Sequence, residues 1–170
     1  MDNNLKGAVL FLTILTTGLS AGLFYAWAVS VIPGIKRIPD KSYLEAMQAI
    51  NRAILNPGFF IIFFGALLLM IWSVYLQYKV SSGLSFWMIA LATVTYLTGN
   101  MGVTIFGNIP LNEMLDQIQL TTLSLEELKS TRHAYERQWN AFHRIRTIFS
   151  VVSFLLLLLA VRMGHHSGMM

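Results

Sequence analysis

The sequence predicts an all-α integral membrane four-helix bundle with short amphipathic surface helices. The 170-residue chain is 55% hydrophobic and 12% charged, with a mean hydropathy of +0.60, which is far more apolar than a soluble domain of this size. It also contains four apolar windows of roughly twenty residues, the length of helix that crosses a bilayer. We expect a single domain over residues 1–170, with spans at about 8–32, 58–78, 85–107 and 142–162.

Composition excludes several classes of site and partner. The chain has no cysteine, so it has no disulfide, thiolate metal site or cysteine nucleophile. Its formal charge of +4 does not indicate a nucleic-acid-binding protein, because the basic residues flank the apolar windows and form no single stripe. The lipid bilayer is therefore an expected partner, and the sequence leaves the oligomeric state open. A small hydrophobic ligand is also expected, on the ground of the motifs in the spans and not of composition.

The first apolar window is read as a transmembrane helix because it is too long for a signal peptide and lacks a small-x-small cleavage site. Gly18, Gly22, Ala26 and Ser30 recur within it every four residues. Small residues at this spacing let another helix approach closely. We expect this ridge to face neighbouring helices.

The segment after the first span predicts a surface helix at about 40–55. In "PDKSYLEAMQAINRAIL" the apolar residues fall on one helical stripe, as in an amphipathic helix lying on the membrane or against the bundle. "NPGFF" then predicts the start of the second span, with Asn56 as the cap and Pro57 at the first helical position.

The third span ends in "GNIPLNEMLD", a polar stretch directly after more than twenty nearly uncharged residues. We expect the chain to turn at Pro110 and to aim Asn112 back toward the bundle, before a short surface helix at about 111–120. The alternative interpretation is that Asn108, Pro110 and Asn112 only cap the span and turn the chain.

The fourth span is predicted to continue a long cytoplasmic helix that opens with the capping box Ser124 and Glu127. Its polar side chains gather on one face at the depth of the Asn108–Asn112 stretch; they are Glu136, Asn140, His143 and Thr147, bordered by Trp139 and Arg146. We therefore expect Asn108, Asn112, His143 and Arg146 to form one hydrogen-bonded cluster. The alternative is that His143 and Arg146 only bind carbonyls or lipid phosphates at the interface.

Several motifs together resemble the anthrone oxygenase-like family of small four-span membrane proteins. They are "GLFYAWAVSVIPGI" in the first span, "NPGFF" at the second, "GNIPLN" after the third, and Trp139-x-x-x-His143-x-x-Arg146-Thr147 at the fourth. The resemblance covers nearly the whole chain. It implies oxidation of an anthrone-like substrate by dioxygen with no cofactor, neither metal nor flavin, and residence in a bacterial inner membrane.

A cofactor-free oxygenase needs a base and a group that stabilises the substrate anion in a water-poor pocket. On this hypothesis His143 is the base and Arg146 stabilises the oxyanion. Asn108, Asn112 and Asn140 would donate hydrogen bonds to substrate oxygens. The aromatic side chains of Trp27, Tyr25 and Trp139 would hold a planar ring.

Other functions remain open at the level of sequence. The competing class is a non-enzymatic membrane protein: a small-ligand or lipid-binding module, or an accessory subunit. Ion transport is disfavoured because no charged residue lies in the middle of a span. No metal site is expected, because the terminal "GHHSGMM", with His165, His166, Met169 and Met170, is a weak signal and no HExxH motif is present.

The distribution of basic residues predicts that both termini lie outside the cytoplasm. Nine Lys and Arg residues fall in the segments after the first and third spans, and three fall on the other side. Because basic residues favour the cytoplasmic side, a C-terminal reporter that is active only outside the cytoplasm should give signal. Activity of a reporter that works only inside the cytoplasm would contradict this orientation.

Overall fold

The computed structural model describes residues 3–79 and 83–167, and these ranges contain helices and no strand. Four of its helical stretches are long and apolar enough to cross a membrane: Asn4–Ile35, Pro57–Tyr78, Leu84–Asp116 and Leu125–Met163. The predicted all-α class with four membrane helices is therefore confirmed.

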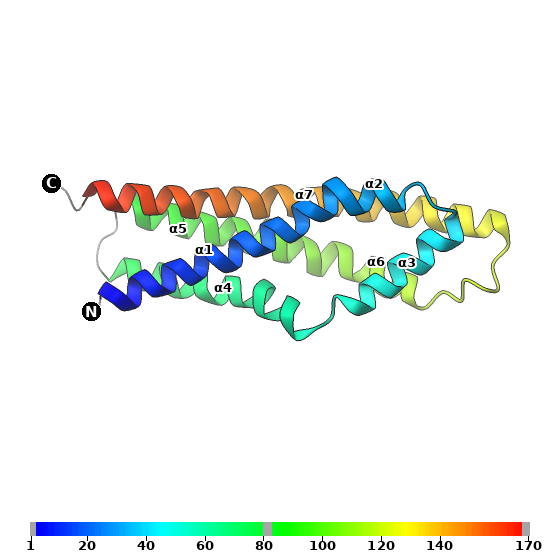
Figure 1. The fold of residues 1–170 in the computed structure, drawn as a ribbon, viewed down its shortest axis with the longest axis horizontal. Helices are drawn as coiled ribbons and strands as arrows, with labels where there is room; N and C mark the ends of the chain where they lie inside the picture. The colour runs from blue at the N-terminus through cyan, green and yellow to red at the C-terminus, as the bar shows by residue number, and fades with distance from the viewer. Residues whose placement is uncertain (1–2, 80–82, 168–170) are drawn as a thin grey trace.

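The helices follow one another with short connections. In chain order they are α1 (Asn3–Ala26), the π-helical segment Trp27–Val31, α2 (Ile32–Ile35), α3 (Asp40–Ala53), α4 (Pro57–Tyr78), α5 (Leu84–Thr95), the π-helical segments Tyr96–Gly102 and Thr104–Asn108, α6 (Ile109–Asp116) and α7 (Leu125–Ser167). The long helices run side by side, and the start of α1 and the end of α7 lie at the same end of the molecule (Figure 1). At the other end lie α3, α6 and the first half of α7.

Helix lengths locate the part of the chain that fits a bilayer. α4 has 22 residues, and at 1.5 Å per residue this is about 33 Å, close to the thickness of the hydrocarbon core. α7 has 43 residues and is about twice as long. Its first half therefore projects beyond the region that α4 spans, and with α3 and α6 it forms what we call the cap.

The cap has an apolar core of its own. The buried residues of this core come from α3, α6, α7 and the α6–α7 connection; they are Tyr43, Leu44, Met47, Leu115, Leu120, Leu128, Tyr135 and Trp139. A separate core fills the far end of the bundle, with Ala66, Met70, Ile89, Ala92, Tyr96, Leu157 and Ala160. The outer surface of the long helices is apolar as well, with Phe11, Leu68, Trp87 and Leu155 among the exposed residues, as expected of a lipid-facing surface.

The predicted amphipathic helix is present as α3, and it packs against α6 and α7 within the cap rather than lying free on a membrane. Arg132 of α7 ties down the α2–α3 connection by donating to the carbonyls of Lys36 and Ile38, both at 2.8 Å, and to Asp40 at 2.9 Å. Its guanidinium also lies 4.4 Å from the ring centre of Tyr43. Burial raises the pKa of the Tyr43 hydroxyl, so this phenol stays neutral under its cation.

Both predicted helix starts are confirmed. The Asn56 side chain accepts from the Phe59 N–H at 3.0 Å, and Pro57 is the first residue of α4. Glu127 accepts from the Ser124 N–H at 2.8 Å, and the Ser124 hydroxyl accepts from the Glu127 N–H at 3.3 Å. α7 then runs unbroken through the bundle, as predicted.

The prediction for the small-residue ridge is wrong beyond its first member. Gly18 packs against the ring of Phe154, but Gly22, Ala26 and Ser30 are exposed, and nothing lies within 4 Å of a Cβ built on Gly22. A spacing of four residues drifts around a helix of 3.6 residues per turn. The face of α1 that is buried follows the helical period instead, with Val9, Thr13, Thr17, Ser20, Ala21 and Phe24.

The predicted turn at Pro110 is also wrong. Asn108 has helical backbone angles (φ −73°, ψ −40°), and α6 begins directly after a π-helical segment with Pro110 in its first turn. Proline is accepted there because the first turn of a helix needs no N–H donor at that position. The third membrane helix therefore continues past the polar stretch to Asp116, and the short surface helix is its continuation.

A close contact between the third membrane helix and α7 gives a stability prediction. A Cβ on Gly99 would overlap the ring of Phe149 on α7, whereas one on Gly65 in α4 would meet nothing within 4 Å. We expect Gly99→Ala to cost about 1–3 kcal/mol through overpacking, and Gly65→Ala to be neutral or stabilising because alanine favours helix. Thermal unfolding of both variants in detergent tests this. Equal melting temperatures would show that the segment Tyr96–Gly102 and α7 are not packed as described.

Candidate functional site

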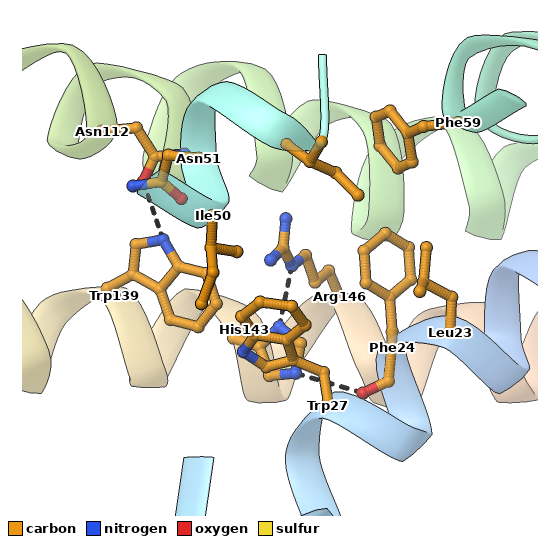
Figure 2. Close-up of a pocket in the computed structure, with 11 residues that line it drawn as sticks. Leu23, Phe24, Trp27, Ile50, Asn51, Phe59, Asn112, Trp139, His143 and Arg146 are labelled. Carbon is orange, nitrogen blue, oxygen red and sulfur yellow. Dashed lines mark hydrogen bonds between the residues drawn. The ribbon is translucent and has the colours of Figure 1, made fainter. Parts of the chain in front are cut away.

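A pocket lies where the cap meets the bundle, between α1, α3, the start of α4, α6 and α7 (Figure 2). The space between its walls, counted together with its open mouth, is about 480 Å³. Its lining residues are Leu23, Phe24, Trp27, Ile50, Asn51, Ile54, Phe59, Asn112, Trp139, His143 and Arg146. The apolar members Leu23, Ile50, Ile54 and Phe59 are partly exposed and form the rim.

The floor of the pocket carries a buried positive charge. Arg146 is 8% exposed, and its guanidinium lies 4.6 Å from the ring centre of Phe24 and 5.1 Å from that of Trp139. It donates to His143 Nδ1 at 3.1 Å and to the Thr104 hydroxyl at 3.5 Å. No carboxylate of the described residues pairs with it, although Arg52, Arg132 and Lys41 all have acidic partners.

His143 is held as one neutral tautomer. Its Nε2 lies 3.2 Å from the carbonyl oxygen of Phe24, which can only accept, so Nε2 carries the hydrogen. Nδ1 accepts from the Nε–H of Arg146, and a guanidinium can only donate. The ring is stacked on Trp139, with 5.0 Å between ring centres and 8° between ring planes. The ring nitrogen of His143 that can accept a proton is therefore Nδ1, and it faces Arg146.

The cap end of the pocket is polar and neutral. Trp139 Nε1 donates to Asn112 Oδ1 at 2.8 Å, and the Tyr135 hydroxyl donates to the same oxygen at 3.0 Å. Asn51 of α3 donates to the Tyr135 hydroxyl at 3.0 Å. Figure 2 shows Asn51 and Asn112 together at this end and Arg146 at a distance from them, with Ile50 and Trp139 between.

The structure brings some of the predicted site residues together and leaves others apart. His143, Arg146, Asn112, Trp139 and Trp27 line the pocket. Three predicted substrate-binding residues do not line it. Asn108 is buried behind Trp139 and donates to its carbonyl at 3.3 Å, Asn140 is partly buried on another face of α7, and Tyr25 is 58% exposed.

The expected single cluster of Asn108, Asn112, His143 and Arg146 is wrong as stated. Only His143 and Arg146 bond to each other, while Asn112 bonds to Tyr135 and Trp139. The reason is that the third membrane helix does not turn at Pro110. Asn112 therefore sits one turn beyond Asn108, at the cap end, where its oxygen meets the indole of Trp139.

Three segments of the described chain are wound as π-helix, and two of them carry residues of the site. The π-helical turns are Trp27–Val31, Tyr96–Gly102 and Thr104–Asn108. Such turns occur frequently at functional sites because the extra residue redirects side chains and backbone groups. Here they carry Trp27, which lines the pocket, and Thr104, which accepts from Arg146.

Sequence reasoning missed several residues of the site, including Asn51, Phe24 and Tyr135. Asn51 was absorbed into the amphipathic pattern of its helix, Phe24 looked like any apolar residue of a span, and Tyr135 gave no signal. Phe24 contributes its carbonyl to His143 and its ring face to Arg146. Of these residues, only Asn51 could have been found from the amphipathic pattern of its helix. An amide next to the apolar stripe of such a helix can face the protein interior.

Among the described residues no group of three or more His, Asp or Glu side chains is arranged to hold a metal ion. The side chains of His165, His166, Met169 and Met170 lie outside the described part. What the pocket offers chemically is a buried cation, a neutral imidazole beside it, two aromatic faces and an apolar rim. This combination suits a largely apolar ligand that carries or develops negative charge on oxygen.

A family model described as anthrone oxygenase matches residues 59–156, more than half of the chain. The match runs from the start of α4 into the second half of α7, and it includes Asn112, Trp139, His143 and Arg146. No curated protein and no solved structure matches the chain.

Proposed function

The chain belongs to the anthrone oxygenase family, and on this premise we propose that it is a membrane-embedded enzyme that oxidises a small apolar aromatic ketone with dioxygen. The observation that carries the proposal is Arg146, a buried guanidinium with no acidic partner among the described residues, at the floor of an apolar-rimmed pocket. Burying a charge without a counter-ion costs several kcal/mol. A ligand that brings negative charge on oxygen would recover this cost.

The first chemical step is loss of a proton from a carbon next to the aromatic rings. His143 accepts this proton at Nδ1, and the carbonyl of Phe24 keeps the ring in the tautomer that has its lone pair there. The substrate ketone becomes an enolate, and its oxygen takes the place of Nδ1 as a partner of Arg146. The developing charge thus appears beside a fixed cation in a site with little water.

The carbanion form of the enolate is itself the reductant. It passes one electron to dioxygen, and the resulting radical pair joins to form a carbon–oxygen bond. The peroxide anion formed in this way takes back the proton held by His143 and becomes a hydroperoxide. Loss of water from this hydroperoxide leaves a second carbonyl group. The overall change is CH₂ plus O₂ to C=O plus H₂O, so atoms and electrons balance with dioxygen as the only oxidant.

The position of the pocket suggests how an apolar substrate arrives. The rim contains Leu23 of α1 and Phe59 in the first turn of α4, and this turn marks one edge of the bilayer-spanning length of the bundle. A hydrophobic molecule dissolved in lipid would meet the rim without crossing water. We propose a bacterial inner membrane as the location, with both termini outside the cytoplasm and the cap inside.

Arg146 gives the first test of the proposal. Arg146→Met should lower oxidation of anthrone by about 100-fold or more, the usual effect of removing an oxyanion-stabilising group. The melting temperature should stay the same or rise, because an unpaired buried charge is removed. Oxygen uptake and quinone formation by detergent-purified protein measure the rate, with subtraction of the protein-free oxidation. Arg144→Met is the matched control, since Arg144 is exposed two residues away on α7.

If Arg146→Met lowers the melting temperature and leaves turnover unchanged, Arg146 only stabilises the fold and has no catalytic role. Mass spectrometry of small molecules that co-purify with wild type and with Arg146→Met gives a second readout. Loss of a bound apolar molecule without any turnover in the wild type would favour a ligand-binding module over an enzyme.

His143 gives a graded test. His143→Asn should be tolerated better than His143→Leu, because an amide can accept from Arg146 and donate to the Phe24 carbonyl while leucine can do neither. We expect a fall in kcat for both variants and a rise in KM mainly for His143→Leu. Equal kcat and KM in the two variants would show that His143 does not position Arg146.

A further inference from the structure

The hydrogen bonds at the cap end of the pocket have only one consistent direction. An indole N–H can only donate, so the Asn112 atom that faces Trp139 Nε1 at 2.8 Å is the amide oxygen. The Tyr135 hydroxyl must then donate to that same oxygen, at 3.0 Å. Having used its hydrogen, this hydroxyl accepts from Asn51, which must present its amide nitrogen. Trp139 therefore fixes the orientation of both amides.

This arrangement leaves two polar groups unused. Both lone pairs of Asn112 Oδ1 are engaged, and the structure shows no partner for Asn112 Nδ2 among the residues it describes. Asn51 Oδ1 likewise has no hydrogen-bond partner among the described residues, because Asn51 bonds to Tyr135 through its nitrogen. Asn51 and Asn112 both line the pocket. Its cap end therefore offers one donor and one acceptor, held by a tyrosine that is fully buried.

We propose that Asn51 and Asn112 form a second binding subsite, which recognises a hydroxyl group of the ligand at the end remote from Arg146. A hydroxyl both accepts and donates, so it can accept from Asn112 Nδ2 and donate to Asn51 Oδ1 at once. A carbonyl or an ether would leave the Asn51 oxygen unpaired, and an ammonium would oppose the Asn112 N–H. This inference rests on the proposed function only in taking an apolar aromatic ketone as the ligand.

The two amides also border water. Asn51 and Asn112 line a second, shallower hollow whose other walls are exposed residues of α3, α6 and the chain next to them: Arg52, Leu55, Glu113, Asp116 and Gln117. The subsite is thus the place where the apolar pocket approaches the aqueous surface. A ligand hydroxyl placed here avoids the cost of full burial, while the ring system stays among Phe24, Trp27 and Trp139.

Asn112→Asp tests the subsite with little change in shape. The carboxylate keeps an oxygen for Trp139 and Tyr135, but it replaces the free N–H donor with an acceptor. The probes are anthrone and the same ring system with one hydroxyl on an outer ring remote from the ketone. Binding is followed by quenching of tryptophan fluorescence, since Trp27 and Trp139 line the pocket. Oxygen is excluded, so that binding is measured without turnover.

Wild-type protein should bind the hydroxylated probe on the order of tenfold more tightly than anthrone, as expected for two added hydrogen bonds. Asn112→Asp should abolish this preference while leaving the affinity for anthrone within about twofold. Asn56→Asp is the matched control, because it makes the same chemical change at an exposed helix cap where aspartate also serves. Tyr135→Phe, which removes the hydroxyl that orients Asn51 while Trp139 still holds Asn112, should reduce the preference too.

Equal affinity for the two probes in the wild type, or a preference that survives Asn112→Asp, would overturn the subsite; the free amide atoms would then be merely hydrated from the second hollow. Discrimination without quinone formation in air would instead refute the proposed oxidation and leave the subsite standing. Failure of both probes to bind would refute both.

Discussion

A positive charge buried among aromatic rings is the constraint on which the arrangement of this protein depends. The guanidinium of Arg146 lies under the faces of Phe24 and Trp139, and its recorded hydrogen-bond partners, His143 and Thr104, are neutral. Aromatic faces and neutral acceptors reduce the cost of burial but do not neutralise the charge. The protein holds the arginine in place with α1, the third membrane helix and α7 together, and it leaves room above it.

The membrane helices and the starts of α4 and α7 could be predicted from sequence because they depend on local chemistry. Hydrophobic length identifies a span, and Asn56-Pro57 or Ser124 with Glu127 identifies a first turn whatever surrounds it. The helix faces could not be predicted in the same way. Gly22 and Ala26 are small whether they meet a helix or lipid, and only the packing of α1 against α4 and α7 decides that Thr13, Thr17 and Ser20 are the residues inside. The continuation of the third helix past Pro110 escaped prediction because π-helical turns have no clear sequence signal.

The residues of the functional site also divide into those that the sequence indicated and those that only the fold reveals. His143, Arg146 and Asn112 stood out because ionisable and amide groups are rare at the edge of an apolar span, and Trp139 because it borders their polar face. All four line the pocket. Asn51 and Phe24 belong to segments that are distant in sequence, and they reach the pocket only because α3 and α1 pack against α7. Tyr135 lies on α7 itself, and only the fold shows that its hydroxyl joins Asn51 to Asn112. Asn108 and Asn140 had equally suggestive composition, yet the helical phase turns them away. The polar residues in the sequence indicated at which end of the spans the site lies. Only the packing of the helices determines which of those residues line the pocket.

The unbroken course of α7 has a mechanical consequence. A helix without proline, glycine or a π-helical turn between Leu125 and Met163 is stiff, because a bend would break hydrogen bonds that nothing else replaces. The helix therefore holds four residues of the site at a constant spacing: Tyr135, Trp139, His143 and Arg146. The wall of the pocket that α3 forms is different, because α3 is bounded on both sides by short non-helical links, at residues 36–39 and 54–56. The α3 wall is thus held by packing and by the bonds of Arg132 at its start, whereas the floor is held by one continuous helix.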